Sequence, residues 1–85
     1  MLIFIRLNGV LAQSIGASRI QITLPPTSTI QDMLENLEAK YPHAAKQIHL
    51  AIPVVNGSHQ AKSIHLSPQQ EVALLMPVAG GCGSL

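Results

Sequence analysis

The hydrophobic and polar positions at the start of the chain predict two strands. Leu2–Leu7 is almost entirely apolar, which is typical of a strand that is covered on both faces. Arg19–Leu24 alternates apolar and polar residues, so we predict a half-buried strand that ends at Pro25-Pro26. Between the strands, Asn8-Gly9 is a turn signal, and Val10–Ser18 indicates a loop with room for one helical turn.

The period then changes to that of a helix, because apolar residues recur at i, i+3, i+4, i+7 and i+11. Thr29 is the expected N-cap, and Asp32 completes an imperfect capping box. Ser28 with Gln31 is the alternative register. Pro42 ends the helix. The apolar positions on its buried face are Ile30, Met33, Leu34, Leu37 and Tyr41.

The remaining elements are shorter. We expect one or two further helical turns over His43–Leu50 and a strand over Ala51–Val55. Asn56-Gly57 predicts a hairpin turn after that strand. Lys62–His65 predicts a weak strand, and Glu71–Met76 predicts the last strand.

This order of elements favours an α+β fold. One crossover helix between two groups of strands predicts a mixed four- to five-stranded sheet that packs on one main helix. A right-handed crossover gives the β-grasp, or ubiquitin-like, arrangement. With 85 residues the chain forms one domain, which we place at residues 1–76.

Composition excludes several classes of function. The formal charge of +1 and the scattered basic residues argue against nucleic-acid binding. No apolar run approaches the roughly 20 residues that span a membrane, and no signal peptide is evident, so we expect a cytoplasmic protein. Only 11% of residues are charged, so some apolar surface is expected to remain for partners.

The titratable residues form no recognisable catalytic or metal-binding pattern. Asp32, Glu35 and Glu38 are expected on the solvated side of the helix, where no acid–base pair results. The histidine spacings match no zinc pattern, so we interpret these residues as surface or packing residues and predict no metal site. We expect no enzymatic activity from this chain alone. The histidines are His43, His49, His59 and His65.

The end of the chain carries the strongest functional signal. The last strand continues directly into Pro77, Val78, Ala79, Gly80 and Gly81, along which the side chains become smaller. Proline cannot extend the sheet, and glycines without Cβ atoms fit a passage that is too narrow for other residues. Residues 77–81 extend about 15 Å, so we predict a flexible tail that reaches into partner active sites.

These features together resemble the MoaD/ThiS family of sulfur carriers. The resemblance covers Met1–Gly81 and rests on Val54-Val55-Asn56-Gly57, Leu66-Ser67-Pro68, and Glu71-Val72 through to Gly80-Gly81. It implies that an adenylating enzyme uses ATP to activate the Gly81 carboxylate. A sulfur nucleophile then converts the acyl-adenylate to a thiocarboxylate, which donates sulfur to a biosynthetic enzyme. The chain would itself bind no cofactor.

The sequence departs from the family pattern at its end, because Cys82-Gly83-Ser84-Leu85 follows the two glycines. Gly81 therefore has no free carboxylate as translated. Some carriers of this family are trimmed after the two glycines by a JAMM-type zinc peptidase, so we predict cleavage at the Gly81–Cys82 bond and removal of residues 82–85. This favours a pathway to cysteine or a sulfur-containing metabolite over molybdopterin or thiamine. Cys82 is interpreted as a discarded residue; a reactive thiol, a disulfide partner and a metal ligand are the alternatives.

Two other functions remain open. The chain is alternatively a ubiquitin-like modifier that is joined to lysines through Gly81, or a β-grasp interaction or regulatory subunit that needs no processing. In each tail-dependent case, partners are expected to contact the apolar sheet surface near the last strand before they take in the tail.

Overall fold

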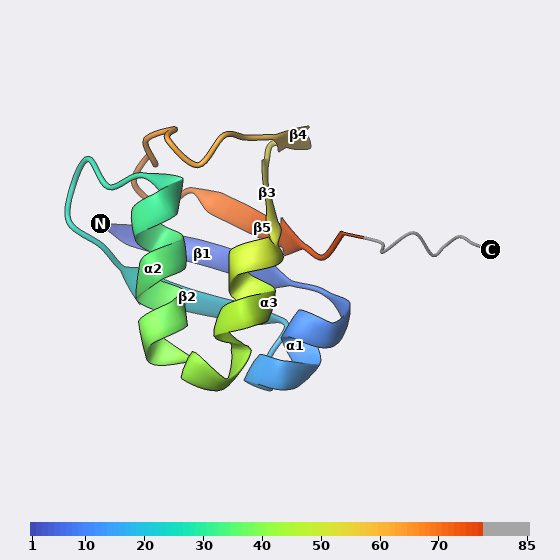
Figure 1. Ribbon diagram of the computed structural model, residues 1–85. Helices are drawn as coiled ribbons and strands as arrows, with labels where there is room; N and C mark the ends of the chain where they lie inside the picture. The colour runs from blue at the N-terminus through green and yellow to red at the C-terminus, as the bar shows by residue number, and fades with distance from the viewer. Residues whose placement is uncertain (78–85) are drawn as a thin grey trace.

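The computed structural model describes residues 1–77, which form a five-stranded mixed sheet with helices packed on one face (Figure 1). The order of the strands in the sheet is β2-β1-β5-β3-β4. The strands are β1 (Leu2–Leu7), β2 (Arg19–Thr23), β3 (Ile52–Val55), β4 (Ser58–His59) and β5 (Glu71–Leu75). This is the predicted β-grasp arrangement.

The first and last strands pair in the middle of the sheet. β1 is antiparallel to β2 and parallel to β5, and β5 is antiparallel to β3. Parallel pairing requires a crossover, which the helical layer supplies. β1 and β5 therefore run in the same direction and finish side by side, with Leu7 opposite Leu74.

The helical layer is larger than the single main helix that we predicted. It contains α1 (Gly9–Ile15), α2 (Ile30–Lys40), a 3₁₀ turn η1 (Pro42–Ala44) and α3 (Ala45–Leu50). The further turns predicted after Pro42 are confirmed. Side chains from three of these helices meet the sheet in one aliphatic core. The core side chains with no exposed surface include Ile3, Leu11, Ile30, Met33, Leu37, Ile48, Val72 and Leu74.

The predicted capping box of α2 is confirmed. The Thr29 hydroxyl accepts from the Asp32 amide at 3.2 Å, and the Thr29 amide donates to Asp32 Oδ2 at 2.9 Å. Both bonds satisfy amides that lack partners within the helix. The alternative cap, Ser28, instead donates its hydroxyl hydrogen to the Pro25 carbonyl at 2.7 Å.

Thr29→Ala is expected to reduce the free energy of unfolding by about 1 kcal/mol, because it leaves the Asp32 amide without its partner. Urea unfolding followed by circular dichroism should show a lower midpoint and an unchanged m-value. Asn36→Ala is the control, since Asn36 is exposed in the same helix and alanine favours helix formation. Equal midpoints for Thr29→Ala and the unmodified chain would contradict the assigned role of the cap.

The segment between the first two strands is a helix of about two turns, which is more helix than the single turn that we allowed within a loop over Val10–Ser18. Leu11 is fully buried, and its packing outweighs the low helix propensity of Gly9, Val10 and Ser14. Gly16 has a φ of 87° and accommodates the left-handed C-terminal cap of α1. Asn8-Gly9 begins this helix and does not form a hairpin turn.

The structure also contradicts the weak strand predicted over Lys62–His65. The Asn56-Gly57 turn is confirmed, and it pairs β3 with the two-residue strand β4 immediately afterwards. The later segment supplies carbonyl groups to the beginning of α2: Ile64 O accepts from the Ile30 amide at 3.0 Å, and Lys62 O accepts from the Gln31 amide at 2.9 Å. These amides at the helix N-terminus need acceptors, so the segment serves the helix and not the sheet.

Candidate functional site

The predicted tail begins just after the central strand of the sheet, β5. β5 has neighbours on both sides, β1 and β3, and its side chains Val72 and Leu74 are fully buried. Pro77, two residues after β5, is exposed. The core therefore fixes the strand that precedes the tail. Pro77 has no amide hydrogen, so it needs no acceptor in the sheet.

Of the predicted site residues, the structure describes Pro77 alone. Val78, Ala79, Gly80 and Gly81 lie outside the described residues, as does Cys82 on the other side of the predicted processing bond. The assignment of Gly81 as the activated residue remains a prediction that rests on the sequence.

The face of the sheet opposite the helices is open to solvent, so our prediction that Leu2–Leu7 is covered on both faces was wrong. In β1, Ile3, Ile5 and Leu7 are buried, whereas Leu2 and Phe4 are partly exposed and Arg6 is exposed. β5 shows the same alternation, which sequence reasoning could not resolve. The strand register places these open-face side chains next to one another: Phe4, Arg6, Arg19, Gln21, Ile52, Val54, Glu71, Ala73 and Leu75.

This open face divides into a polar half and an apolar half. Over β1 and β2, Arg6 lies opposite Arg19, and Arg6 Nη1 lies 3.9 Å from Glu71 Oε1. Both members of this ion pair are about half exposed, so the pair contributes little to stability. Beyond Glu71, the open face over β5 and β3 carries the small and aliphatic side chains Ala73, Leu75, Ile52 and Val54. The apolar half therefore adjoins the tail.

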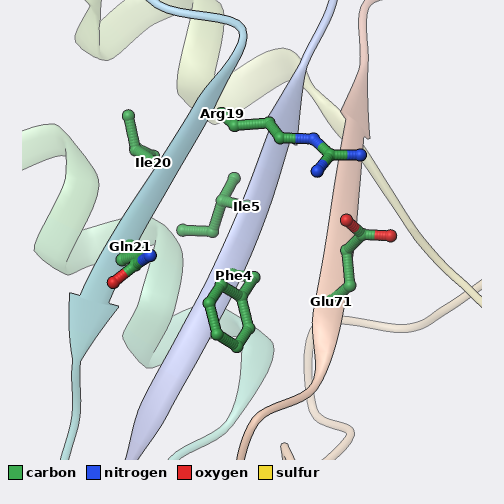
Figure 2. Close-up of a pocket in the computed structure, with 6 residues that line it drawn as sticks. All are labelled: Phe4, Ile5, Arg19, Ile20, Gln21 and Glu71. Carbon is green, nitrogen blue, oxygen red and sulfur yellow. The ribbon is translucent and has the colours of Figure 1, made fainter.

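A shallow hollow of about 540 Å³ lies over the polar half (Figure 2). The figure shows the side chain of Arg19 extending across β1 towards Glu71, with Phe4 and Gln21 along the strands below. Two arginines face one carboxylate here, so this half of the face has an excess of positive charge. A partner surface that covers this half would be electrostatically complementary if it carried a carboxylate.

Two of the histidines form long-range contacts with backbone carbonyl groups. His43 Nε2 lies 2.7 Å from the Ser14 carbonyl, between η1 and α1, and His65 Nδ1 lies 2.8 Å from the Thr27 carbonyl. Among residues 1–77, no three His, Cys, Asp or Glu side chains are grouped so that they would hold a metal ion. No helix within that same range is both long enough and apolar enough to cross a membrane.

Solved structures with the same fold include two from archaea. SAMP1 from Haloferax volcanii has 22% sequence identity and a TM-score of 0.80, and the alignment covers 95% of this chain and 100% of SAMP1. A putative molybdopterin converting factor, subunit 1, from Pyrococcus furiosus has 16% identity and a TM-score of 0.82, with 92% and 99% of the two chains covered. At these identities the likeness establishes the fold. A search of curated proteins gave no match.

The fold and the position of the tail thus define a small β-grasp protein whose C-terminal segment leaves from a central strand. The model of the ThiS family matches residues 5–81. The chain therefore belongs to the ThiS family of sulfur carriers, in agreement with the resemblance found in the sequence. The match ends at Gly81, so Cys82–Leu85 lie beyond it.

Proposed function

We propose that this protein is a sulfur carrier that becomes active when residues 82–85 are removed and the carboxylate of Gly81 is exposed. The observation that carries this proposal is the ThiS family match, which extends to Gly81 and stops there. The firmly held strand β5 supports it, because a tail with a fixed base is presented in a defined direction to a partner.

The proposed chemistry takes place at the carboxyl carbon of Gly81. Hydrolysis of the Gly81–Cys82 amide by a JAMM-type zinc peptidase adds water and releases the four-residue peptide. The new carboxylate attacks the α-phosphorus of ATP, so that an acyl-adenylate forms and pyrophosphate leaves. Hydrosulfide, or a sulfur donor equivalent to it, then forms the carbon–sulfur bond as AMP departs. A closed active site in the partner enzyme would exclude water, which otherwise competes with the sulfur nucleophile for the acyl-adenylate.

The division of the chain follows from this scheme. Residues 1–76 serve as the domain that partners bind, residues 77–81 as the tail, and residues 82–85 as the removable extension. The peptidase, the adenylating enzyme and the sulfur-accepting enzyme each need access to the same tail. We propose that they dock on the apolar half of the open face, beside β5. Synthesis of cysteine or of a sulfur-containing metabolite is the proposed purpose.

The intact mass of the protein purified from its native host tests this function. We expect a mass that lacks Cys82–Leu85, together with a second species in which sulfur replaces one carboxylate oxygen. Alkylation of the second species with iodoacetamide should add one label, although the trimmed chain contains no cysteine. A single full-length mass while the pathway is active would refute processing and would favour the unprocessed interaction subunit.

A second candidate function is attachment to other proteins through Gly81. The observation that favours it is the shared fold with SAMP1 and with H. volcanii small archaeal modifier protein 1, which has 21% identity and a TM-score of 0.78 and is named as a modifier. This function uses the same trimming and adenylation but ends in an amide bond to lysine. Protein-sized conjugates that disappear in a lysate of a Gly81→Ala strain would support it over sulfur transfer.

A further inference from the structure

The outer edge of β2 is unpaired among the described residues. β2 is last in the order of the sheet, with β1 on one side and no strand on the other (Figure 2). Exposed strand edges are usually protected by short length, by proline, by a bulge or by charged side chains. Arg19–Thr23 has five residues and no proline, and it pairs with β1 without a bulge. Its one charged side chain, Arg19, extends away from the edge across β1 (Figure 2).

The hydrogen bonds at the two ends of the β1–β2 ladder show which backbone groups of β2 face outwards. The Leu7 amide donates to the Ser18 carbonyl at 2.8 Å, and the Leu24 amide donates to the Met1 carbonyl at 2.8 Å. In an antiparallel ladder such bonded pairs recur at every second residue, and the residues between them direct their amide and carbonyl groups to the opposite side. The outward groups of β2 therefore belong to Arg19, Gln21 and Thr23.

We propose that this edge pairs with the same edge of a second copy, so that a symmetric dimer joins two five-stranded sheets into one. An antiparallel pair centred on Gln21 uses all the outward groups, since Gln21 meets its own copy and Arg19 meets Thr23. Each of these pairs exchanges two backbone hydrogen bonds. On the helical face, Ile20 comes beside Ile22 of the second copy, and aliphatic cross-strand neighbours stabilise such a pair. No like charges meet in this register.

One side of α2 faces the same edge of the sheet. Glu38 Oε2 lies 4.0 Å from His49 Nδ1, so the side of α2 that carries Glu38 is turned towards α3 and the middle of the sheet. Away from α3, Asp32 and Asn36 line a shallow hollow together with residues 24–28, which follow directly after β2. A second copy at the β2 edge therefore meets this side of α2.

The charges on this side of α2 complement themselves in a symmetric dimer. Asp32, Asn36 and Lys40 are exposed and four residues apart, so they form one row with an acid at its beginning and a base at its end. The two-fold axis that brings Gln21 to its own copy also reverses the direction of α2. The acidic end of one row therefore faces the basic end of the other, which favours this register over a parallel one.

An extended peptide from another protein is the other occupant that a strand edge accepts. The second copy is favoured because it matches the edge in backbone groups, in aliphatic neighbours and in the charges of α2 at once. The dimer does not depend on the sulfur-carrier function. β1 separates each β5 from the joint, and the β5 strands of the two copies run in opposite directions. The two tails then begin at opposite ends of the joined sheet, so that two enzymes have access to one dimer.

Sedimentation equilibrium of the full-length chain tests the dimer, with a reductant present to keep Cys82 from forming disulfides. We expect a dimer with a Kd on the order of 100 µM, because a strand edge and one row of side chains bury less than a standard interface. Amide hydrogen exchange by NMR should show protection of Arg19, Gln21 and Thr23 that increases with protein concentration. A monomer up to about 1 mM overturns the proposal, as does a dimer that protects other residues instead.

Two substitutions separate the predicted contacts. Lys40→Glu places an acid opposite Asp32 of the second copy and should raise the Kd about tenfold or more. Lys46→Glu is the matched control, since it changes the net charge equally from an exposed position in α3 and should leave the Kd unchanged. Gln21→Pro removes an outward amide that β1 does not use, so a folded monomer is expected. Equal Kd values for the two glutamate variants overturn the proposal, and this comparison decides the matter even if Gln21→Pro does not fold.

Discussion

Gly81→Ala should lower the thiocarboxylate-bearing fraction roughly 100-fold, because a misplacement of about 1 Å at a reacting centre costs that much in rate. The added Cβ would occupy the narrow part of the channel beside the carbon that is trimmed, adenylated and sulfurated. The intact mass of the protein from its native host measures the fraction. Thermal unfolding should be unchanged, since the buried core of the described residues runs from Ile3 to Leu74.

Gly83→Ala is the matched control for this substitution. It exchanges the same residue types two positions further along, in the part of the chain that the proposed peptidase discards. The thiocarboxylate fraction should equal that of the unmodified chain. A normal fraction in Gly81→Ala would contradict the tail-dependent functions, whereas equal losses in both variants would indicate that the extension itself has a function.

Leu74→Ala should have the largest effect on stability, a loss of about 3 kcal/mol in the free energy of unfolding. Leu74 has no exposed surface and lies between Leu7 of β1 and Pro53 of β3. Truncation leaves a cavity at the centre of the sheet that the flanking strands cannot close. For a domain of this size, the melting temperature should fall by about 10 °C or more. The variant would then be only marginally stable.

The neighbouring residue provides the control for Leu74→Ala. Leu75 is 38% exposed on the other face of the same strand, so Leu75→Ala should cost about 1 kcal/mol or less. Calorimetric scans of both variants at one pH and one concentration make the comparison. If the two substitutions lower the melting temperature equally, the alternation of buried and open positions in β5 would be wrong.

The sequence alone predicted the elements whose signals are local. The period of apolar residues in α2, its cap at Thr29 and the turn at Asn56-Gly57 each depend on residues within a few positions of one another. The ThiS family pattern was likewise recognisable in the sequence, because it lies in the order of residues and not in their packing. The role of Gly81 remains a prediction. Whether Gly81–Cys82 is cleaved remains a prediction.

Tertiary structure decided the features that depend on distant neighbours. α1 forms because Leu11 packs into the core, although Gly16 and the serines around it favour a loop. Residues 62–65 lose their predicted strand because the amides at the beginning of α2 take their carbonyl groups. Local propensity is weak compared with such long-range contacts, so the residues themselves do not reveal the outcome.

The accessible face of the sheet also depends on tertiary structure. Leu2–Leu7 looked like a strand covered on both faces, since its composition does not say how many layers pack against it. Only the placement of every helix on one side of the sheet leaves Phe4 and Arg6 accessible. The sequence by itself predicted Gly81 as the reacting residue, because that prediction depends on residue order, whereas the packing of the helices on one face of the sheet decided which side chains remain accessible.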